Sequence, residues 1–202
     1  MKEVEKIFTE KYIKNSWMGS ESKSGPGSSL HNNKKLLSLM CDFFKNNNIK
    51  SISDYGCGDF NWMKHFDFES VDRYLGVDIV EEMINQNTSK YETEKIKFKK
   101  LNIIEDDIKE KFDVILCKDV LFHLSYEDAK SVIENIKKSG STYLLSTTFI
   151  DFINKDIKTG QWRPINLEFD PFNMGDPITI WKNIEDKTEG WITKSIGIWK
   201  IN

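Results

Sequence analysis

Residues 51–148 alternate short apolar stretches with segments of helical periodicity. The apolar stretches fall at residues 51–55, 74–77, 96–101, 112–117 and 142–148, and the helical segments at residues 61–66, 81–90 and 126–138. Strands that alternate with helices are typical of a parallel sheet covered by helices on both faces. We therefore expect a doubly wound α/β domain with five parallel strands.

The flanking regions follow other patterns. Apolar residues from Leu30 to Phe44 recur at near-helical spacing, with Ser28 or Ser29 as N-cap, and this predicts one more helix. After Phe149 the alternation stops, and residues 178–184 and 194–201 predict two further strands joined by a turn at residues 185–190. For the helix from residue 126, Ser125 followed by Asp128 gives a start signal of the capping-box type.

The N-terminal segment is distinct in composition. Residues 19–29 are too rich in glycine, proline and serine for a helix or strand and predict a loop. We divide the chain into an N-terminal arm, residues 1–29, and one domain, residues 30–202. The loop of the arm could close over a site as a lid, and the alternative is a disordered arm.

Composition excludes several function classes. The formal net charge of −3 lacks the basic excess of nucleic-acid enzymes, so a small-molecule substrate is favoured. No apolar run is long enough to span a bilayer, and the acidic start does not resemble a signal peptide, so we expect a cytoplasmic monomer or homodimer. Three separated cysteines and three scattered histidines predict neither disulfides nor a metal site. Residues 85–87 and similar asparagine-rich runs are interpreted as solvated surface.

A glycine turn follows the first predicted strand. Gly56 and Gly58 allow the backbone to turn sharply and to approach a ligand, and Asp78 ends the next strand about 20 residues later, where an acid can bind a ribose. A structural turn without a ligand is the plain alternative. Asn61 stands where a dinucleotide fingerprint has its third glycine, which favours a nucleoside without pyrophosphate, such as S-adenosylmethionine, over NAD.

The order of these motifs resembles the class I S-adenosylmethionine-dependent methyltransferases. The matching segments are residues 54–59, 76–78, 100–102 and 112–116. The resemblance implies a seven-stranded Rossmann-like mixed sheet, with Asp54 near the cofactor ammonium, Asp78 on the ribose and Asn102 near adenine. The predicted cofactor-binding residues are Trp17, Asp54, Gly56, Gly58, Asp59, Asn61, Trp62, Asp78, Ile79, Asn102, Ile103 and Lys118.

The chain is also similar to a less characterised bacterial group of these enzymes. The similarity lies in residues 17–20, 24–28, 58–63, 117–119, 123–125 and 163–167. Some members are linked to surface (capsular) polysaccharide biosynthesis, which implies a carbohydrate-linked acceptor: a sugar, a sugar nucleotide or a phosphate-bearing precursor.

Methyl transfer to a hydroxyl requires a base near the end of the fourth strand. His123 is the preferred base, and its alternative role is that of an inert residue packed at a helix start. Asp119 could orient the imidazole, take the proton itself or position the substrate.

A loop in the C-terminal quarter supplies candidate acceptor contacts. Arg163 offers a planar fork for a carboxylate or phosphate, and Asn166 and Trp162 lie close to it in the sequence. The activity we expect is O-methylation. N-methylation of a small amine, a Rossmann oxidoreductase and a non-catalytic cofactor-binding module remain the alternatives.

Overall fold

The computed structural model describes residues 2–106, 109–182, 184 and 194–202. The chain consists of two compact units, residues 1–102 and residues 103–202. Each unit is described by itself.

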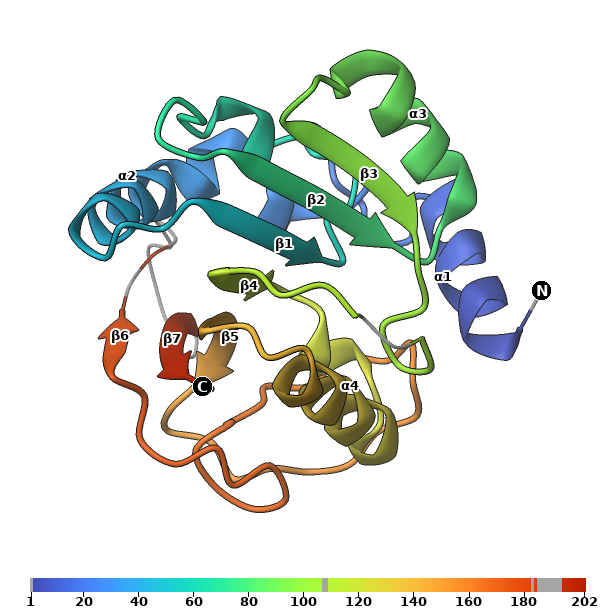
Figure 1. Ribbon diagram of the computed structural model, residues 1–202. Coiled ribbons are helices and arrows are strands. Elements are labelled where there is room, and N and C mark those ends of the chain that lie inside the picture. Colours follow the sequence, from blue (N-terminus) through green and yellow to red (C-terminus); the bar gives the residue numbers. More distant parts are fainter. Residues whose placement is uncertain (1, 107–108, 183, 185–193) are drawn as a thin grey trace. The chain divides into compact units, whose positions relative to one another are not determined.

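The first unit contains three parallel strands in the order β3-β2-β1 (Figure 1). The register pairs Asp54 with Gly76 and Asp78 with Lys100. The strands are β1 (Ser51–Tyr55), β2 (Arg73–Asp78) and β3 (Ile96–Lys100), and the helices are α1 (Glu3–Ile13), η1 (Pro26–Ser28), α2 (Leu30–Asn46), η2 (Met63–His65) and α3 (Glu81–Tyr91).

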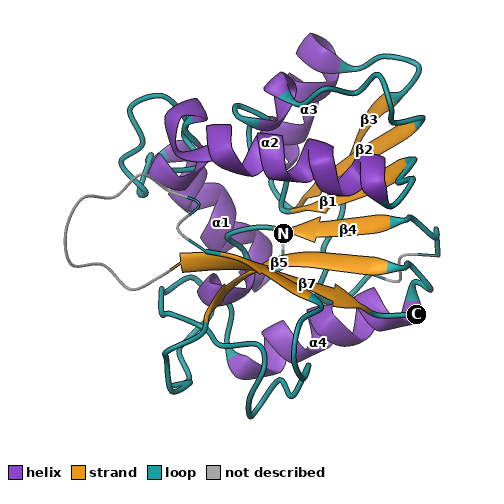
Figure 2. Cartoon of the chain, turned by 90° about the vertical axis from the view of Figure 1, so that its left-hand side faces the viewer, coloured by secondary structure: helices purple, strands orange, loops and turns teal. Residues whose placement is uncertain are grey.

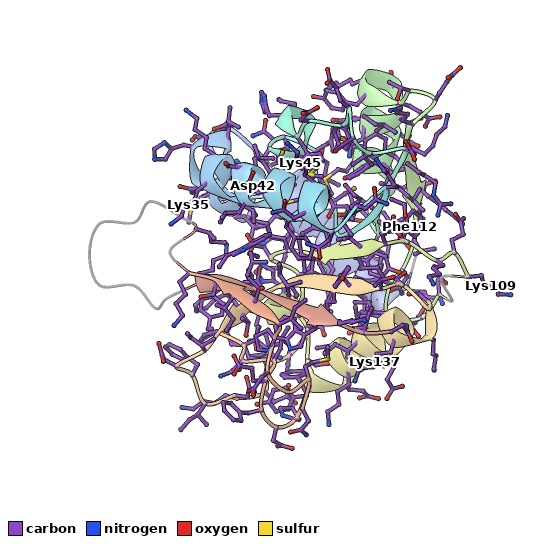
Figure 3. The ribbon with its side chains drawn as sticks, turned by 60° about the vertical axis from the view of Figure 1, so that its left-hand side comes forward. Lys35, Asp42, Lys45, Lys109, Phe112 and Lys137 are labelled. Carbon is purple, nitrogen blue, oxygen red and sulfur yellow. The ribbon has the colours of Figure 1, made fainter. Side chains whose placement is uncertain are left out.

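Helix α2 shows how the sequence sets its boundaries and its buried face. Ser29 is the N-cap, and its hydroxyl accepts a hydrogen bond from the Asn32 N–H at 3.3 Å. Lys35, Asp42 and Lys45 lie on the exposed side (Figure 3), opposite a buried side formed by Leu36, Leu37, Met40 and Phe44. The predicted helix is confirmed.

An aromatic cluster around Phe60 fills the core beside β2 and β3. The Phe60 ring centroid lies 5.3 Å from that of Tyr74 and 5.0 Å from that of Phe98. The predicted helix at residues 61–66 is wrong in extent, because only the three residues of η2 are helical. Phe60 has a φ of 58°, outside the right-handed helical region, so the backbone of the glycine turn continues up to the start of this segment.

The N-terminal segment contains α1, which the sequence analysis did not predict. Tyr12 of this helix packs with Val80 and Met83, and Phe8 and Trp17 pack against the same cluster. The N-terminal segment is therefore bound to the start of α3 through apolar contacts.

The second unit contains four strands in the order β4-β5-β7-β6. They are β4 (Val114–Cys117), β5 (Tyr143–Phe149), β6 (Thr179–Trp181) and β7 (Lys194–Lys200), with η3 (Leu121–His123) and α4 (Tyr126–Lys138) between β4 and β5. Strands β4, β5 and β7 lie side by side (Figure 2), with β5 parallel to β4 and antiparallel to β7. Strand β7 also runs antiparallel to β6.

Seven strands of mixed direction confirm the predicted fold class. The insertion of an antiparallel β7 beside β5 departs from the all-parallel order of the dinucleotide-binding fold. Strand β6 is shorter than predicted, and the predicted turn at residues 185–190 lies outside the described residues.

Helix α4 buries Ala129, Val132, Ile133 and Ile136 and exposes charged residues between them. Its N-cap is Ser125, as predicted, with the Ser125 hydroxyl accepting from the Asp128 N–H at 3.2 Å. Among the described helices, none combines the length and the apolar character that crossing a membrane requires.

Candidate active site

Strand β1 runs directly into the glycine turn. The N–H groups of Gly56 and Cys57 donate to the Val77 carbonyl at 2.8 and 3.0 Å, so the turn is tied to β2. Gly56 and Gly58 have φ angles of 74° and 59°, in the left-handed region that favours glycine. The sequence folds into this sharp turn because glycine occupies both positions.

Asp78 lies beside this turn. Its Oδ2 accepts from the Gly58 N–H at 3.1 Å, and its Oδ1 accepts from the Val80 N–H at 3.0 Å. Burial raises the pKa of Asp78, and these backbone hydrogen bonds oppose that rise. A carboxylate has about four lone-pair sites, so the group can accept a further hydrogen bond from a ligand hydroxyl, such as one of a ribose.

Asp54 is the last residue but one of β1, just before the turn. The Tyr74 hydroxyl donates to Asp54 Oδ2 at 2.7 Å, and both side chains are buried. Burial and the Asp54 charge raise the pKa of Tyr74 well above its usual range, so the phenol remains a donor. The Asp54 carboxylate is thereby held at the carboxyl end of β1.

Asn87 on α3 is hydrogen-bonded to the glycine turn. Its Nδ2 donates to the Gly58 carbonyl at 2.8 Å, and the side chain is 2% exposed. The interpretation of residues 85–87 as solvated surface is therefore wrong for Asn87. This residue lies on the buried side of α3 with Met83 and Ile84, and its polar type hid that position in the sequence.

Replacing Asn87 with leucine should lower the free energy of unfolding by about 1–3 kcal/mol, because the Gly58 carbonyl loses its buried donor. Asn85 is exposed on the same helix, so Asn85→Leu is the matched control and should change stability by less than about 0.5 kcal/mol. Urea denaturation measures both. Equal effects would show that the Asn87 hydrogen bond contributes nothing particular.

The Asp59 side chain fastens the N-terminal loop to the glycine turn. It accepts from the Ser22 hydroxyl at 2.8 Å and from the Lys23 N–H at 3.1 Å, and its own N–H donates to Ser24 Oγ at 3.0 Å. A Cβ on Gly58 would lie 2.5 Å from Ser24 Oγ, so glycine is required at this contact as well. Asp59 was predicted as a cofactor contact, and its hydrogen bonds to the N-terminal loop were not predicted.

Asn61 serves the same segment. Its Nδ2 donates to Glu21 Oε1 at 2.6 Å and to the Ser28 carbonyl at 3.0 Å, and its Oδ1 accepts from Lys64 Nζ at 3.0 Å. Residues 21–28 are thus tied to the segment after the turn by the side chains of Asp59 and Asn61.

The remaining predicted cofactor residues have varied surroundings. Trp62 is buried at 5% exposure, while Trp17 stacks on Phe8 and packs, like Ile79, against the Tyr12 cluster. The chain after β3 starts beside the site, because the Leu101 N–H donates to the Asp78 carbonyl at 2.9 Å. Asn102 follows directly, and Ile103 in the second unit is buried, with its carbonyl accepting from Asn135.

In the second unit, Asp119 is the centre of a charged network at the end of β4. Lys118 Nζ and Lys194 Nζ each lie 2.6 Å from Asp119 Oδ2, and the Thr147 hydroxyl donates to Oδ1 at 2.8 Å. Asp119 has a φ of 60°, a region that aspartate tolerates better than most residues. The Lys118 side chain, predicted to bind cofactor, is engaged here.

This network keeps Asp119 ionised. Burial alone would raise the pKa of Asp119, but the charges and hydrogen bonds of Lys118 and Lys194 outweigh it and hold the pKa well below its usual range. Such a carboxylate cannot take a proton near neutral pH.

His123 finds its hydrogen-bond partner in the C-terminal loop. Its Nδ1 lies 2.8 Å from the Gln161 carbonyl oxygen. Because a carbonyl only accepts, Nδ1 carries the proton and the neutral ring has its lone pair on Nε2. The hydrogen bonds of Asp119 go to Lys118, Lys194 and Thr147, so a carbonyl, in place of the predicted acid, orients the imidazole.

Residues 159–163 pair with residues 122–125 along their length. The Gly160 N–H donates to the His123 carbonyl at 2.7 Å, and the Arg163 N–H donates to the Phe122 carbonyl at 3.1 Å. The Ser125 N–H donates to Thr159 Oγ1 at 2.9 Å, and that hydroxyl donates to Asp128. Thr159 thus bridges the two ends of the predicted capping box.

The Phe122 ring lies near two of the predicted site residues, His123 and Trp162. Its centroid lies 4.6 Å from the His123 ring, 6.2 Å from the Trp162 ring and 5.9 Å from Lys194 Nζ. Trp162 is 48% exposed, so it offers an aromatic surface near the imidazole.

The other two predicted acceptor contacts are buried. Arg163 donates from Nη1 to the Leu124 carbonyl at 2.5 Å. Asn166 donates to the Ile150 carbonyl at 2.9 Å and accepts from the Glu168 N–H at 3.0 Å. Asn166 thereby shapes the loop, a role that its polar type in the sequence did not reveal.

Part of the chain matches a known protein family. Residues 54–139 match a family described as a methyltransferase domain. The match begins at Asp54, includes the glycine turn and Asp78, and ends after α4. No curated protein matches the sequence.

Solved structures share the fold over most of the chain. Magnesium protoporphyrin IX methyltransferase from Synechocystis PCC 6803 with bound SAM has a TM-score of 0.68 at 12% identity and covers 99% of this chain and 98% of its own. The N-methyltransferase NodS from Bradyrhizobium japonicum WM9 with S-adenosyl-L-homocysteine has a TM-score of 0.69 at 11% identity, with coverages of 94% and 97%. A S-adenosylmethionine-dependent methyltransferase from Clostridium acetobutylicum ATCC 824 has a TM-score of 0.61 at 15% identity, with coverages of 83% and 91%.

The predicted enzyme class is confirmed by the methyltransferase domain together with this fold. Residues 54–139 thus match a methyltransferase domain, and solved methyltransferases with this fold hold S-adenosylmethionine or S-adenosyl-L-homocysteine.

Proposed function

We propose that the protein is a cytoplasmic O-methyltransferase that acts on a small or carbohydrate-linked acceptor, such as a sugar, a sugar nucleotide or a phosphate-bearing precursor of a surface polysaccharide. The observation that carries the proposal is the His123–Gln161 hydrogen bond, because it leaves a basic nitrogen on the imidazole. Amines that react in their neutral form need less help from a base.

The residues of the glycine turn fit the cofactor. Asp78 would hold the ribose hydroxyls, Asp54 would attract the ammonium group, and Gly56 and Gly58 would allow close approach of the backbone. When bound, S-adenosylmethionine supplies a methyl group activated by a sulfonium.

His123 would take the proton of the acceptor hydroxyl at Nε2. The Gln161 carbonyl would stabilise the resulting imidazolium through Nδ1–H. Asp119 would act indirectly, because it holds Lys118 and Lys194 in position. The partly exposed Trp162 offers a surface on which a sugar ring can pack.

The test is transfer of labelled methyl from S-adenosylmethionine to a panel of sugars, sugar nucleotides, phosphorylated sugars and small amines. We expect labelled ethers from hydroxyl-bearing acceptors. Labelling of amines alone, at a rate that does not depend on His123, would overturn the proposal in favour of N-methylation.

Replacing Asp78 with alanine should weaken S-adenosylmethionine binding about 10- to 100-fold, because the ribose hydroxyls would lose the charged carboxylate that accepts their hydrogen bonds. Isothermal titration calorimetry measures the affinity. Asp72→Ala is the matched control, since Asp72 is exposed just before β2, and its affinity should equal that of the wild type. Equal affinity in the Asp78 variant would remove this residue from the cofactor site.

A further inference from the structure

We propose that Nε and Nη2 of Arg163 form a binding site for an anionic group, a carboxylate or a phosphate, carried by the acceptor. The sequence predicted Arg163 as an acceptor contact, and the structure adds that these two nitrogens are buried and unsatisfied. The identification of its anion with the acceptor rests on the proposed function.

Arg163 is buried, with 4% of its surface exposed. One of its nitrogens is satisfied, because Nη1 donates to the Leu124 carbonyl. Nε and Nη2 are both buried and make no hydrogen bond within the described part of the chain. Buried donors without acceptors are uncommon in proteins and are costly, especially on a charged group.

Among the described residues, no acidic side chain is hydrogen-bonded to the Arg163 guanidinium. Its central carbon lies 5.1 Å from the Tyr126 ring centroid, and the Asp156 charge acts on it from further away. The Asp156 carboxylate accepts instead from the N–H groups of Tyr126 and Ile157, at 2.7 and 2.8 Å. Burial consequently lowers the pKa of Arg163.

The two unsatisfied nitrogens form a matched pair. Nε–H and Nη2–H lie on one side of the planar guanidinium and point in the same direction, which suits the two oxygens of a carboxylate or phosphate. The Nη1–Leu124 hydrogen bond fixes this plane, so the fork is oriented before a ligand arrives.

The fork is attached to the segment that carries the proposed base. The Arg163 N–H donates to the Phe122 carbonyl, and its side chain holds Leu124, the residues on either side of His123. An anion bound at the fork would therefore be positioned relative to the imidazole. Since both nitrogens are shielded from solvent, the anion enters only when neighbouring side chains move aside.

The chain has two arginines, Arg73 and Arg163, which makes the test direct. The protein labelled with ¹⁵N gives two arginine Nε–Hε resonances, and Arg73 is exposed and serves as an internal control. Glucose 6-phosphate and glucuronate are titrated separately at constant ionic strength, with glucose as the uncharged control. We expect a saturable shift of the Arg163 resonance with one or both anions and none with glucose.

Variants assign the effect to the fork. Arg163→Lys keeps a charge without the planar fork and should bind the effective anion at least about tenfold more weakly, as measured by calorimetry. Arg73→Lys should bind like the wild type. Equal shifts at both arginines, or no shift at Arg163, would overturn the inference, and so would wild-type affinity in Arg163→Lys. S-adenosylmethionine binding and methyl transfer are measured separately, so a protein that transfers methyl without an Arg163 response disproves the site alone.

Discussion

Replacing His123 with alanine should lower the methyl-transfer rate about 10²- to 10⁴-fold, the range that positioned acid–base groups contribute. The reason is the loss of the proton acceptor Nε2. The Gln161 carbonyl fixes this tautomer because it accepts the hydrogen bond from Nδ1–H. The affinity for S-adenosylmethionine should stay unchanged, because the glycine turn and Asp78 belong to other elements. Single-turnover rates with labelled cofactor, on the best acceptor of the panel, measure the effect.

Two controls separate catalysis from folding in this variant. His65→Ala removes an exposed histidine of η2 and should keep the wild-type rate. Free imidazole added to His123→Ala should restore part of the rate, since it can take the proton in the space that the side chain leaves. A wild-type rate in His123→Ala would eliminate the base assignment. If imidazole has no effect and circular dichroism shows that His123→Ala is misfolded, His123→Gln is measured in its place.

Predictions made from the sequence succeed where one local pattern determines one local structure. The strands, α2 and α4 were predictable because apolar periodicity and serine caps are properties of neighbouring residues. The glycine turn and Asp78 were predictable for the same reason, since the spacing of parallel strands brings their carboxyl ends together.

Predictions fail where a contact joins distant segments or uses the backbone. The Gln161 carbonyl leaves no signature in the sequence, because every residue has a carbonyl group. Lys194 reaches Asp119 across 75 positions, and Ser22 reaches Asp59 across 37. Asp59 and Asn61 were predicted as cofactor contacts from their position after the turn, and the hydrogen bonds from their side chains to the N-terminal loop were not predicted.

The pairing of residues 159–163 with residues 122–125 shows a predicted residue and an unpredicted contact at one site. One side of the pairing carries His123, whose type attracted attention in the sequence, and the other carries the backbone oxygen that orients it. The chemistry of the site therefore depends on a loop that periodicity could not place. The candidate site was predictable in its residue types and unpredictable in its hydrogen bonds.

Replacing Asp119 with asparagine should lower the free energy of unfolding at pH 7 by about 3–5 kcal/mol, the usual cost of removing one partner from a buried ion pair. Lys118 and Lys194 are shielded from solvent and would lose the carboxylate oxygen that both contact. Thr147→Val removes the neutral hydrogen bond to the same carboxylate and should cost less, about 1–3 kcal/mol.

The pH dependence distinguishes lost charge from lost packing in the Asp119 variant. The folded pKa of Asp119 lies below its unfolded value of about 3.9, so its ionisation stabilises the protein above that value and this contribution falls as the pH drops towards the folded pKa. The difference in unfolding free energy between wild type and Asp119→Asn should therefore be constant from pH 8 to about pH 5 and shrink below about pH 4. Urea denaturation across this range measures it. A difference that does not change down to pH 3 would show that the carboxylate acts through its shape and hydrogen bonds, with no contribution from its charge.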